Sequence, residues 1–231
     1  MKMKLQTVTL GCSKNKVDTE HILSQVEGLY EIIPEGEDIP VDVLLLNTCG
    51  FIGDAKEESI QAVLEAVDRK ARGEVGKVIV FGCLSQRYGH ELPDLIPEVD
   101  GWLGAREFDP VIRALGVEPD RSKDAERYLT TPSHYAYLKI SEGCDRRCSY
   151  CAIPFIRGAH KSVPMEQLVE EARRLADKGV RELIIIAQDT TYYGLDLYRR
   201  RALAELLQKL SEVEGIEWIR IHYSYPAAFP E

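Results

Sequence analysis

The 231-residue sequence contains no apolar run that approaches the roughly 20 residues of a membrane-spanning helix. Residues 1–12 also lack the long apolar segment of a secretory signal. These two absences predict a cytoplasmic protein without a membrane partner. The six cysteines would then lie in a reducing compartment, where thiols serve metals or catalysis more often than disulfide bonds.

An excess of positive charge is absent as well. The sequence has 38 acidic residues against 29 basic ones, which gives a net charge of -9. A surface of this sign repels nucleic acid, because binding to a phosphate backbone depends on Lys and Arg. It attracts a basic protein, although an acidic balance can also serve solubility only. Composition therefore favours a basic protein partner over nucleic acid.

The first half of the chain alternates between strand-like and helix-like segments. Short apolar runs rich in β-branched residues lie at residues 5–10, 41–46 and 78–81, and segments with helical spacing lie between them at about residues 16–28 and 54–72. This alternation predicts an α/β domain with an open parallel sheet of the flavodoxin-like kind, which we place at residues 1–118.

Each of the three predicted strands ends next to a cysteine, namely Cys12, Cys49 or Cys83. In an open parallel sheet the ligand site lies beyond the carboxyl ends of the strands, so the three thiols should meet at one edge. A glycine adjoins each of them and permits tight turns. A single free cysteine is often just a small buried hydrophobe. Three in equivalent positions indicate a shared metal site.

The second half of the chain repeats the strand and helix pattern after a polar linker at residues 119–132. We predict strands at residues 135–140, 182–187 and 218–222, with helices at 164–178 and 202–213. The continuous apolar run at 182–187 is typical of a strand that is buried between two helix layers. We interpret residues 133–231 as part of a (βα) barrel, whose three visible strands leave an edge open.

A C-x3-C-x2-C motif formed by Cys144, Cys148 and Cys151 follows the first of these strands. Three thiolates can bind three corners of a four-iron cluster and leave one iron open. An open iron can bind the amino and carboxylate groups of S-adenosylmethionine. A zinc site is the alternative, but it needs a fourth ligand. His134 and His160 are the nearest histidines, and neither falls in a recurring zinc-finger spacing.

Polar side chains follow the other two predicted strands of this half. Gln188, Asp189, Thr190 and Thr191 come after the strand at 182–187, and residues 223–226 follow the last strand. Because the carboxyl ends of barrel strands face one cavity, these groups could bind the amino group, ribose or adenine of the cofactor. Capping of the next segment is the other explanation for Asp189 and its neighbours.

With both cysteine trios placed, the sequence resembles the radical S-adenosylmethionine methylthiotransferases. The matching segments are residues 9–15, 47–52, 81–88 and 141–154, with Arg157 and Gly158 beyond them, and they extend over nearly the whole chain. Residues 139–148 and 187–194 resemble the branch of the family that modifies a ribosomal protein. The transfer-RNA branch typically has asparagine where Asp189 stands.

The resemblance implies two four-iron clusters and S-adenosylmethionine as cofactors. Cys144, Cys148 and Cys151 would hold the radical-generating cluster, and Cys12, Cys49 and Cys83 would hold an auxiliary one. We expect the cofactor to be bound by Gln188, Asp189, Thr190, Tyr150 and Arg157. No catalytic residue is expected beyond the cluster ligands.

The implied reaction adds a methylthio group to the β-carbon of an aspartate in the twelfth small-subunit ribosomal protein. One cofactor molecule would methylate a sulfur on the auxiliary open iron, and a second would yield the 5'-deoxyadenosyl radical that abstracts hydrogen from the aspartate. A flavodoxin or ferredoxin would supply electrons. The family also has further barrel strands and a C-terminal TRAM domain that this sequence does not contain, so we expect the piece by itself to have little activity.

Two other functions remain open at this point. A transfer-RNA methylthiotransferase would use the same chemistry on adenosine but should need a basic docking surface. A non-catalytic iron-sulfur carrier or electron-transfer module would hold clusters without responding to S-adenosylmethionine.

Overall fold

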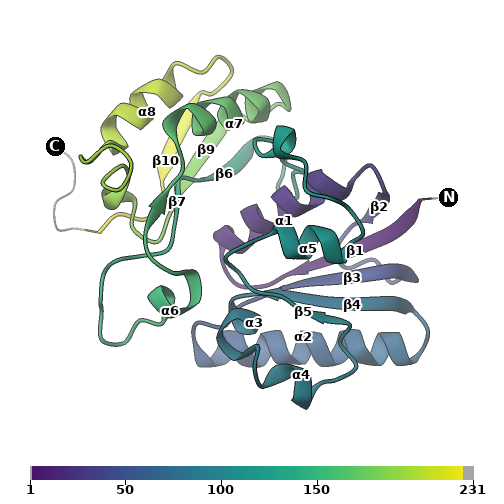
Figure 1. Ribbon diagram of the computed structural model, residues 1–231. Coiled ribbons are helices and arrows are strands. Elements are labelled where there is room, and N and C mark those ends of the chain that lie inside the picture. The colour runs from purple at the N-terminus through teal and green to yellow at the C-terminus, as the bar shows by residue number, and fades with distance from the viewer. Residues whose placement is uncertain (1, 226–231) are drawn as a thin grey trace. The chain divides into compact units, whose positions relative to one another are not determined.

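A computed structural model describes residues 2–225 and divides the chain into two compact units, which meet between Arg121 and Ser122 (Figure 1). This division falls within the segment 119–132 that the sequence predicts as a linker. The predicted domain bounds themselves stay a prediction. Pro226, expected at the tip of the last strand, lies outside the described residues.

Unit 1 is built on a five-stranded sheet in which all neighbouring strands are parallel. In spatial order the strands are β2 (Tyr30–Ile33), β1 (Met3–Thr9), β3 (Val41–Thr48), β4 (Val75–Gly82) and β5 (Gly101–Trp102). This is the strand order 2-1-3-4-5 of flavodoxin-like folds. The predicted open parallel sheet is therefore confirmed.

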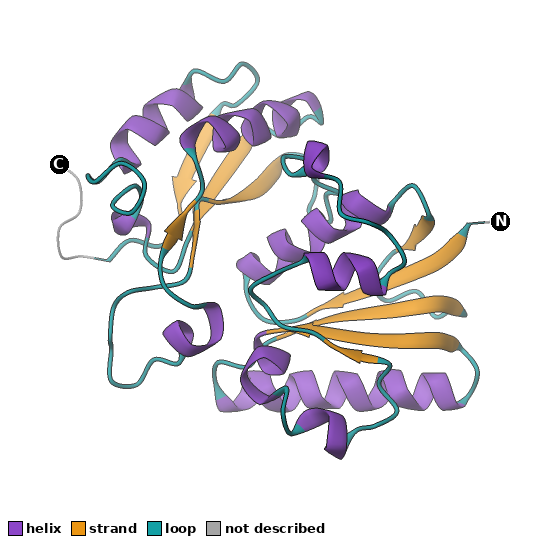
Figure 2. Ribbon diagram, in the orientation of Figure 1, coloured by secondary structure: helices purple, strands orange, loops and turns teal. Residues whose placement is uncertain are grey.

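Helices cover both faces of this sheet. Figures 1 and 2 show α1 (Ser13–Val26) and α5 (Asp109–Ala114) over one face and α2 (Gly53–Ala71) along the other. Residues 43–48 of β3 are consequently all buried, since Leu44 and Leu46 pack toward α2 while Leu45 points to the opposite side. The shorter helical segments are α3 (Cys83–Tyr88), α4 (Leu92–Leu95) and a 3-10 turn at Arg121–Lys123.

Unit 2 contains a three-stranded parallel sheet in the order β10 (Trp218–Ile221), β9 (Glu182–Ile186) and β6 (Tyr135–Lys139). Its longer helices are α7 (Met165–Asp177) and α8 (Leu203–Ser211). The remaining elements are an antiparallel pair, β7 (Ser141–Glu142) with β8 (Lys161–Ser162), the short helix α6 (Ile153–Arg157) and a 3-10 turn at Thr190–Tyr192. The predicted strand and helix alternation is confirmed.

The core of unit 2 lies between the sheet and the helices α7 and α8. Leu183 and Ile185 of β9 are fully buried in this core, whereas Ile184 between them faces the other way and is only half-buried. The expectation that helices cover β9 on both sides is therefore not met within unit 2. A continuous apolar run cannot distinguish a strand covered by helices on both faces from a strand with one face toward a barrel interior, because that interior is also apolar.

The first residues of unit 2 are held by a buried ion pair. The Arg127 guanidinium donates to the Glu171 carboxylate at 2.8 Å and to the carbonyl oxygen of Tyr137 at 3.0 Å, and both charged side chains are almost fully enclosed. Removal of one partner from such a pair would leave a buried charge unpaired. This contact joins the chain before β6 to helix α7.

None of the helices among residues 2–225 combines the length and the apolar character that crossing a membrane requires.

Gly82, at the end of β4, gives a direct test of the strand-end geometry. Its φ of 105° and ψ of -159° lie in a region that glycine alone adopts readily, and a Cβ there would lie 2.5 Å from Asn47 Oδ1. We expect Gly82→Ala to lower the free energy of unfolding by at least about 3 kcal/mol in urea titrations.

Gly36→Ala is the matched control, because Gly36 also has a positive φ of 88° but has open space around its Cα. We expect a loss of only about 1 kcal/mol there. Equal losses in the two variants would contradict the close approach of the loops at Gly82.

Candidate metal centres

Three cysteine loops meet at the carboxyl edge of the sheet in unit 1. Glycines permit the contact, because a Cβ on Gly11 would lie 2.7 Å from Cys49 Cβ, and a Cβ on Gly50 would lie 2.8 Å from the carbonyl oxygen of Cys83. The loop with Cys12 therefore touches the loop with Cys49, which touches the loop with Cys83. The sequence-based expectation of tight turns and close backbone approach is confirmed here.

Asn15, on the first turn of α1, connects the same three loops. Its side-chain Nδ2 donates to the carbonyl oxygens of Leu10 at 2.8 Å and Thr48 at 3.4 Å, and its Oδ1 lies 3.9 Å from both Cys12 Sγ and Cys83 Sγ. Because carbonyl oxygens only accept hydrogen bonds, the amide nitrogen must face them. The amide oxygen consequently faces the two sulfur atoms.

Two more polar side chains fix the backbone around Cys49. Ser59 of α2 accepts from Cys49 N at 2.9 Å and donates to Cys49 O at 3.0 Å. Asn47 donates through Nδ2 to the carbonyl oxygen of Asn15 at 2.8 Å. Within residues 2–225, Asn47 Oδ1 and Ser85 Oγ are buried and have no hydrogen-bond partner. Buried polar atoms without partners are uncommon and mark places where a bound group would be accommodated.

The arrangement of thiols fits a cluster better than a single ion. In the described part of the chain no three His, Cys, Asp or Glu side chains are close enough to share one metal ion, and none of the six cysteines is in a disulfide. Zinc needs four donors around one atom at about 2.0–2.3 Å, and the described side chains do not form such a set. A four-iron cluster offers each thiolate its own iron, so loops that converge around a common space suffice.

The second cysteine trio lies in the loop between β7 and α6 of unit 2. Cys144 N donates to Gly158 O at 3.1 Å, and Cys151 N donates to Cys148 O at 3.0 Å. Burial raises the pKa of the Cys144 thiol, and the negative charges of Asp189, Cys151 and Cys148 raise it further, against a backbone hydrogen bond from Arg146. The loop thus places Cys148 and Cys151 where their charges act on Cys144, and a bound metal centre would reverse that effect.

Glu142, two residues before Cys144, is the centre of a charged network. Its Oε2 accepts from Lys139 Nζ at 2.8 Å and from Arg157 at 3.1 Å, and its Oε1 accepts from Gln188 Nε2 at 2.8 Å. Burial would raise the pKa of this carboxyl, but the charges of Lys139 and Arg157 outweigh it and hold the pKa well below the ordinary glutamate value. Glu142 therefore stays ionised at neutral pH.

Asp189 joins the cysteine loop to the carboxyl end of β9. Its Oδ2 accepts from Arg146 Nε, and its Oδ1 accepts from Thr191 N at 3.0 Å, which caps the following 3-10 turn. The Arg146 guanidinium also lies 3.6 Å from the ring centroid of Tyr225 and 4.7 Å from that of Tyr192. The sequence suggests that Asp189 either caps the next segment or belongs to the cofactor site. In the structure Asp189 caps the turn and also faces the cysteine loop.

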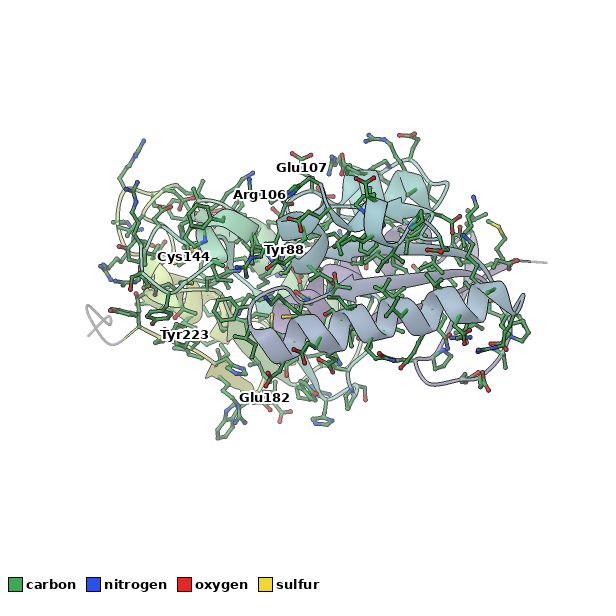
Figure 3. All side chains as sticks on the ribbon, turned by 90° about the horizontal axis from the view of Figure 1, so that it is seen from below. Tyr88, Arg106, Glu107, Cys144, Glu182 and Tyr223 are labelled. Atoms are coloured by element: carbon green, nitrogen blue, oxygen red, sulfur yellow. The ribbon has the colours of Figure 1, made fainter. Side chains whose placement is uncertain are left out.

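The carboxyl ends of β9 and β10 are also joined. Thr190 Oγ1 donates to the carbonyl oxygen of Tyr223 at 2.6 Å and lies 3.1 Å from Ser224 Oγ. Figure 3 labels Tyr223 and Cys144 on the same unit. The residues that follow the strands of unit 2 therefore meet at one end of its sheet, as their sequence positions predict.

The five residues predicted to bind the cofactor have different surroundings. Gln188 and Arg157 share the carboxylate of Glu142, Asp189 and Thr190 lie at the end of β9, and Tyr150 in the cysteine loop is 87% exposed. Their binding role stays a prediction. Sequence reasoning missed Glu142, Lys139, Arg146 and Asn15. Only Asn15 had a usable signal, since it lies one helical turn after Cys12.

Two family models match the chain. The Uncharacterized protein family UPF0004 matches residues 4–104, and the Radical SAM superfamily matches residues 138–231. The fold and the cysteine motif therefore define a UPF0004 region followed by a radical SAM region.

Curated relatives narrow the resemblance to one branch. "Ribosomal protein uS12 methylthiotransferase RimO" from Christiangramia forsetii is 52% identical over 229 residues, which are 99% of this chain and 50% of that protein. Proteins of the same name from Cytophaga hutchinsonii and Bacteroides fragilis are each 51% identical, covering 99% and 100% of this chain and 53% and 54% of their own lengths. The chain thus spans about half the length of the curated relatives it matches.

Solved structures share the fold at low sequence identity. The cobalamin-dependent S-adenosylmethionine radical enzyme OxsB, with aqua-cobalamin bound, matches with a TM-score of 0.59 and 14% identity, over 94% of this chain and 38% of its own. The radical S-adenosylmethionine methyltransferase TsrM from Kitasatospora setae, with cobalamin and a [4Fe-4S] cluster bound, gives 0.58 and 12%, over 90% and 51%. These similarities support the α/β architecture only.

Asn15→Ala tests whether this side chain ties the three loops together. The variant leaves the buried carbonyl oxygens of Leu10 and Thr48 without their donor. We expect the free energy of unfolding to fall by about 1–3 kcal/mol in urea titrations. Gln61→Ala is the control, because it removes an exposed amide from α2 and should change stability by less than about 0.5 kcal/mol. Equal effects would contradict the role of Asn15.

Glu142→Gln tests the charged network through its pH dependence. Because the folded pKa of Glu142 is lowered, its stabilising contribution is complete above the unfolded value of about 4.3 and is lost as pH falls toward the folded pKa. We expect the variant to lose about 1–3 kcal/mol at pH 7, where Lys139 and Arg157 lack their counter-charge. In denaturation curves, the stability difference between wild type and variant should shrink as the pH falls from the unfolded pKa toward the folded pKa of about 2. A constant difference across this range, or the same loss in the exposed control Glu214→Gln, would contradict the network.

Proposed function

We propose that the chain is part of a radical S-adenosylmethionine methylthiotransferase that modifies the ribosomal protein uS12. The observation that carries this proposal is the presence of two cysteine trios, each at the carboxyl end of a parallel sheet, in a chain about half identical to proteins named RimO. Because the chain spans only about half the length of those relatives, the activity of the complete protein is also proposed.

Each trio would hold one four-iron cluster. Cys144, Cys148 and Cys151 would hold the cluster that binds S-adenosylmethionine, and Cys12, Cys49 and Cys83 would hold the auxiliary one. When bound, these groups supply one-electron chemistry that acid and base side chains cannot perform on an unactivated C–H bond. The chain's own task is to hold the cofactor and the substrate within reactive distance.

The residues around Glu142 suit the amino group of the cofactor. In the described part of the chain, Gln188 Oε1 is buried without a hydrogen-bond partner, while its Nε2 is held by Glu142. An ammonium group is a pure donor and would satisfy this acceptor. Lys139 and Arg157 keep Glu142 ionised, so Gln188 stays in the orientation that presents Oε1. We assign the contact with the amino group to Gln188 on this basis. The binding roles of Asp189, Thr190, Tyr150 and Arg157 rest on the resemblance to the family.

The substrate would be a basic ribosomal protein. The net charge of -9 favours such a partner and disfavours transfer RNA. The similarity to proteins named RimO points the same way. We place the protein in the cytoplasm, with a flavodoxin or ferredoxin as electron donor.

The competing functions give different results in two assays. A transfer-RNA enzyme would bind transfer RNA with an affinity that falls steeply with salt. An electron-transfer module would show no change in its cluster spectrum when S-adenosylmethionine is added. We expect weak transfer-RNA binding and a clear spectral change.

Cysteine variants test the division of labour between the two trios. After anaerobic reconstitution we expect about 8 irons per chain, and about 4 when either trio is replaced by alanine. Cys144→Ala should abolish formation of 5'-deoxyadenosine, whereas Cys49→Ala should leave cleavage uncoupled from methylthiolation. Equal cleavage in the two variants would refute this assignment. Iron content is a readout that does not depend on a complete barrel.

A further inference from the structure

Two cations lie beside the cysteine trio of unit 1. Arg87 follows Cys83 by one turn on α3, so the two side chains share a face of that helix. One Arg87 nitrogen donates to the carbonyl oxygen of Gly50 at 2.9 Å, and Gly50 directly follows Cys49. The guanidinium is therefore held against the loop that carries a predicted cluster ligand.

Lys56 reaches the same place from α2. It precedes Ser59 by three residues, and Ser59 holds the backbone of Cys49, so both side chains lie on the face of α2 that points to the trio. Lys56 Nζ lies 3.5 Å from the hydroxyl oxygen of Tyr88, which is labelled in Figure 3. Lys56 and Arg87 lie 5.7 Å and 5.3 Å from the Tyr88 ring centroid.

Neither cation has an acidic partner among residues 2–225. Elsewhere in the unit, Lys70 pairs with Asp100 and Arg72 pairs with Glu74. The neighbours of the two cations named above are the Gly50 carbonyl oxygen and the Tyr88 ring, which are both neutral. Partial burial of unpaired like charges is costly, and an anion bound between them would remove that cost.

The reaction proposed above identifies the chemistry of that anion. The sulfur is added to the β-carbon of an aspartate, and the carboxylate carbon of the same side chain is bonded directly to that β-carbon. When the β-carbon meets the sulfur donor at the auxiliary trio, the carboxylate must also lie beside the trio. Resting on that proposed function, we infer that Lys56, Arg87 and Tyr88 bind the side-chain carboxylate of the aspartate to be modified.

The three groups are suited to a carboxylate. An arginine fork can donate two parallel hydrogen bonds to its two oxygens, and the contact with Gly50 fixes the plane of the fork. Lys56 supplies a second positive charge, and the Tyr88 hydroxyl supplies a neutral donor. This set distinguishes aspartate from asparagine, because an amide has one oxygen and presents N–H groups toward the cations.

The test uses the metal-free chain and a minimal aspartate mimic. N-acetyl-aspartate N-methylamide and the matching asparagine compound are titrated into chain labelled with ¹⁵N at arginine, and the Arg87 side-chain signal is followed by NMR. We expect the aspartate compound to shift this signal with an affinity at least about 5-fold higher than that of the asparagine compound.

Variants assign the preference to the named side chains. Lys56→Met should reduce the preference several-fold. Arg87→Lys, followed through the backbone amide signals of α3, should retain part of it because the charge remains. Lys77→Met is the control, since Lys77 is an exposed cation near the opposite end of β4. Backbone NMR spectra report whether each variant is folded.

Several results would overturn the inference: no shift of the Arg87 signal with either compound, equal affinity for both, or the same preference in Lys56→Met as in wild type. Because no iron is present, these outcomes are independent of cluster loading. If the chain fails to bind iron or to respond to S-adenosylmethionine, the proposed function fails separately.

Discussion

Both units depend on the geometry of parallel strands, which carry their carboxyl ends to the same edge of a sheet. In unit 1 this brings the loops after β1, β3 and β4 together, and each loop contains a cysteine. In unit 2 it brings together the residues that follow β9 and β10. Sites at this edge are a general property of such sheets. The chemistry is then decided by a few residues just beyond each strand.

Close approach of the loops in unit 1 depends on small and polar residues rather than on apolar packing. Gly11 and Gly50 allow backbone contact where a side chain would clash, and Asn15 and Ser59 hold the backbone through hydrogen bonds. A network of this kind fixes positions more narrowly than a hydrophobic contact does, because its donors and acceptors are directional. The backbone that carries the three cysteines is therefore fixed by directional contacts at this edge of the sheet.

The sequence predicts the parts of the fold that are local. Apolar periodicity identifies β1, β3, β4, β6, β9 and β10, and cysteine spacing identifies both trios. It does not identify β2 and β5, which have four and two residues and form only beside neighbouring strands. The contacts of Glu142 with Gln188, 46 residues away, and of Arg146 with Asp189, 43 residues away, are equally invisible, because they arise only when the chain folds. The prediction that helices cover both faces of β9 fails for a similar reason. The sequence shows that a strand is apolar but not which elements cover it.

Incomplete ligation is the central claim for Cys144, Cys148 and Cys151: these three thiolates would bind a four-iron cluster and leave one iron accessible. Mössbauer spectroscopy of chain reconstituted with ⁵⁷Fe, with Cys12, Cys49 and Cys83 replaced by alanine, tests it most directly. The account predicts that S-adenosylmethionine changes the signal of one iron in four, because only the iron without a cysteine can bind the cofactor. A spectrum that is unchanged by the cofactor, or one that shows isolated irons, would contradict it.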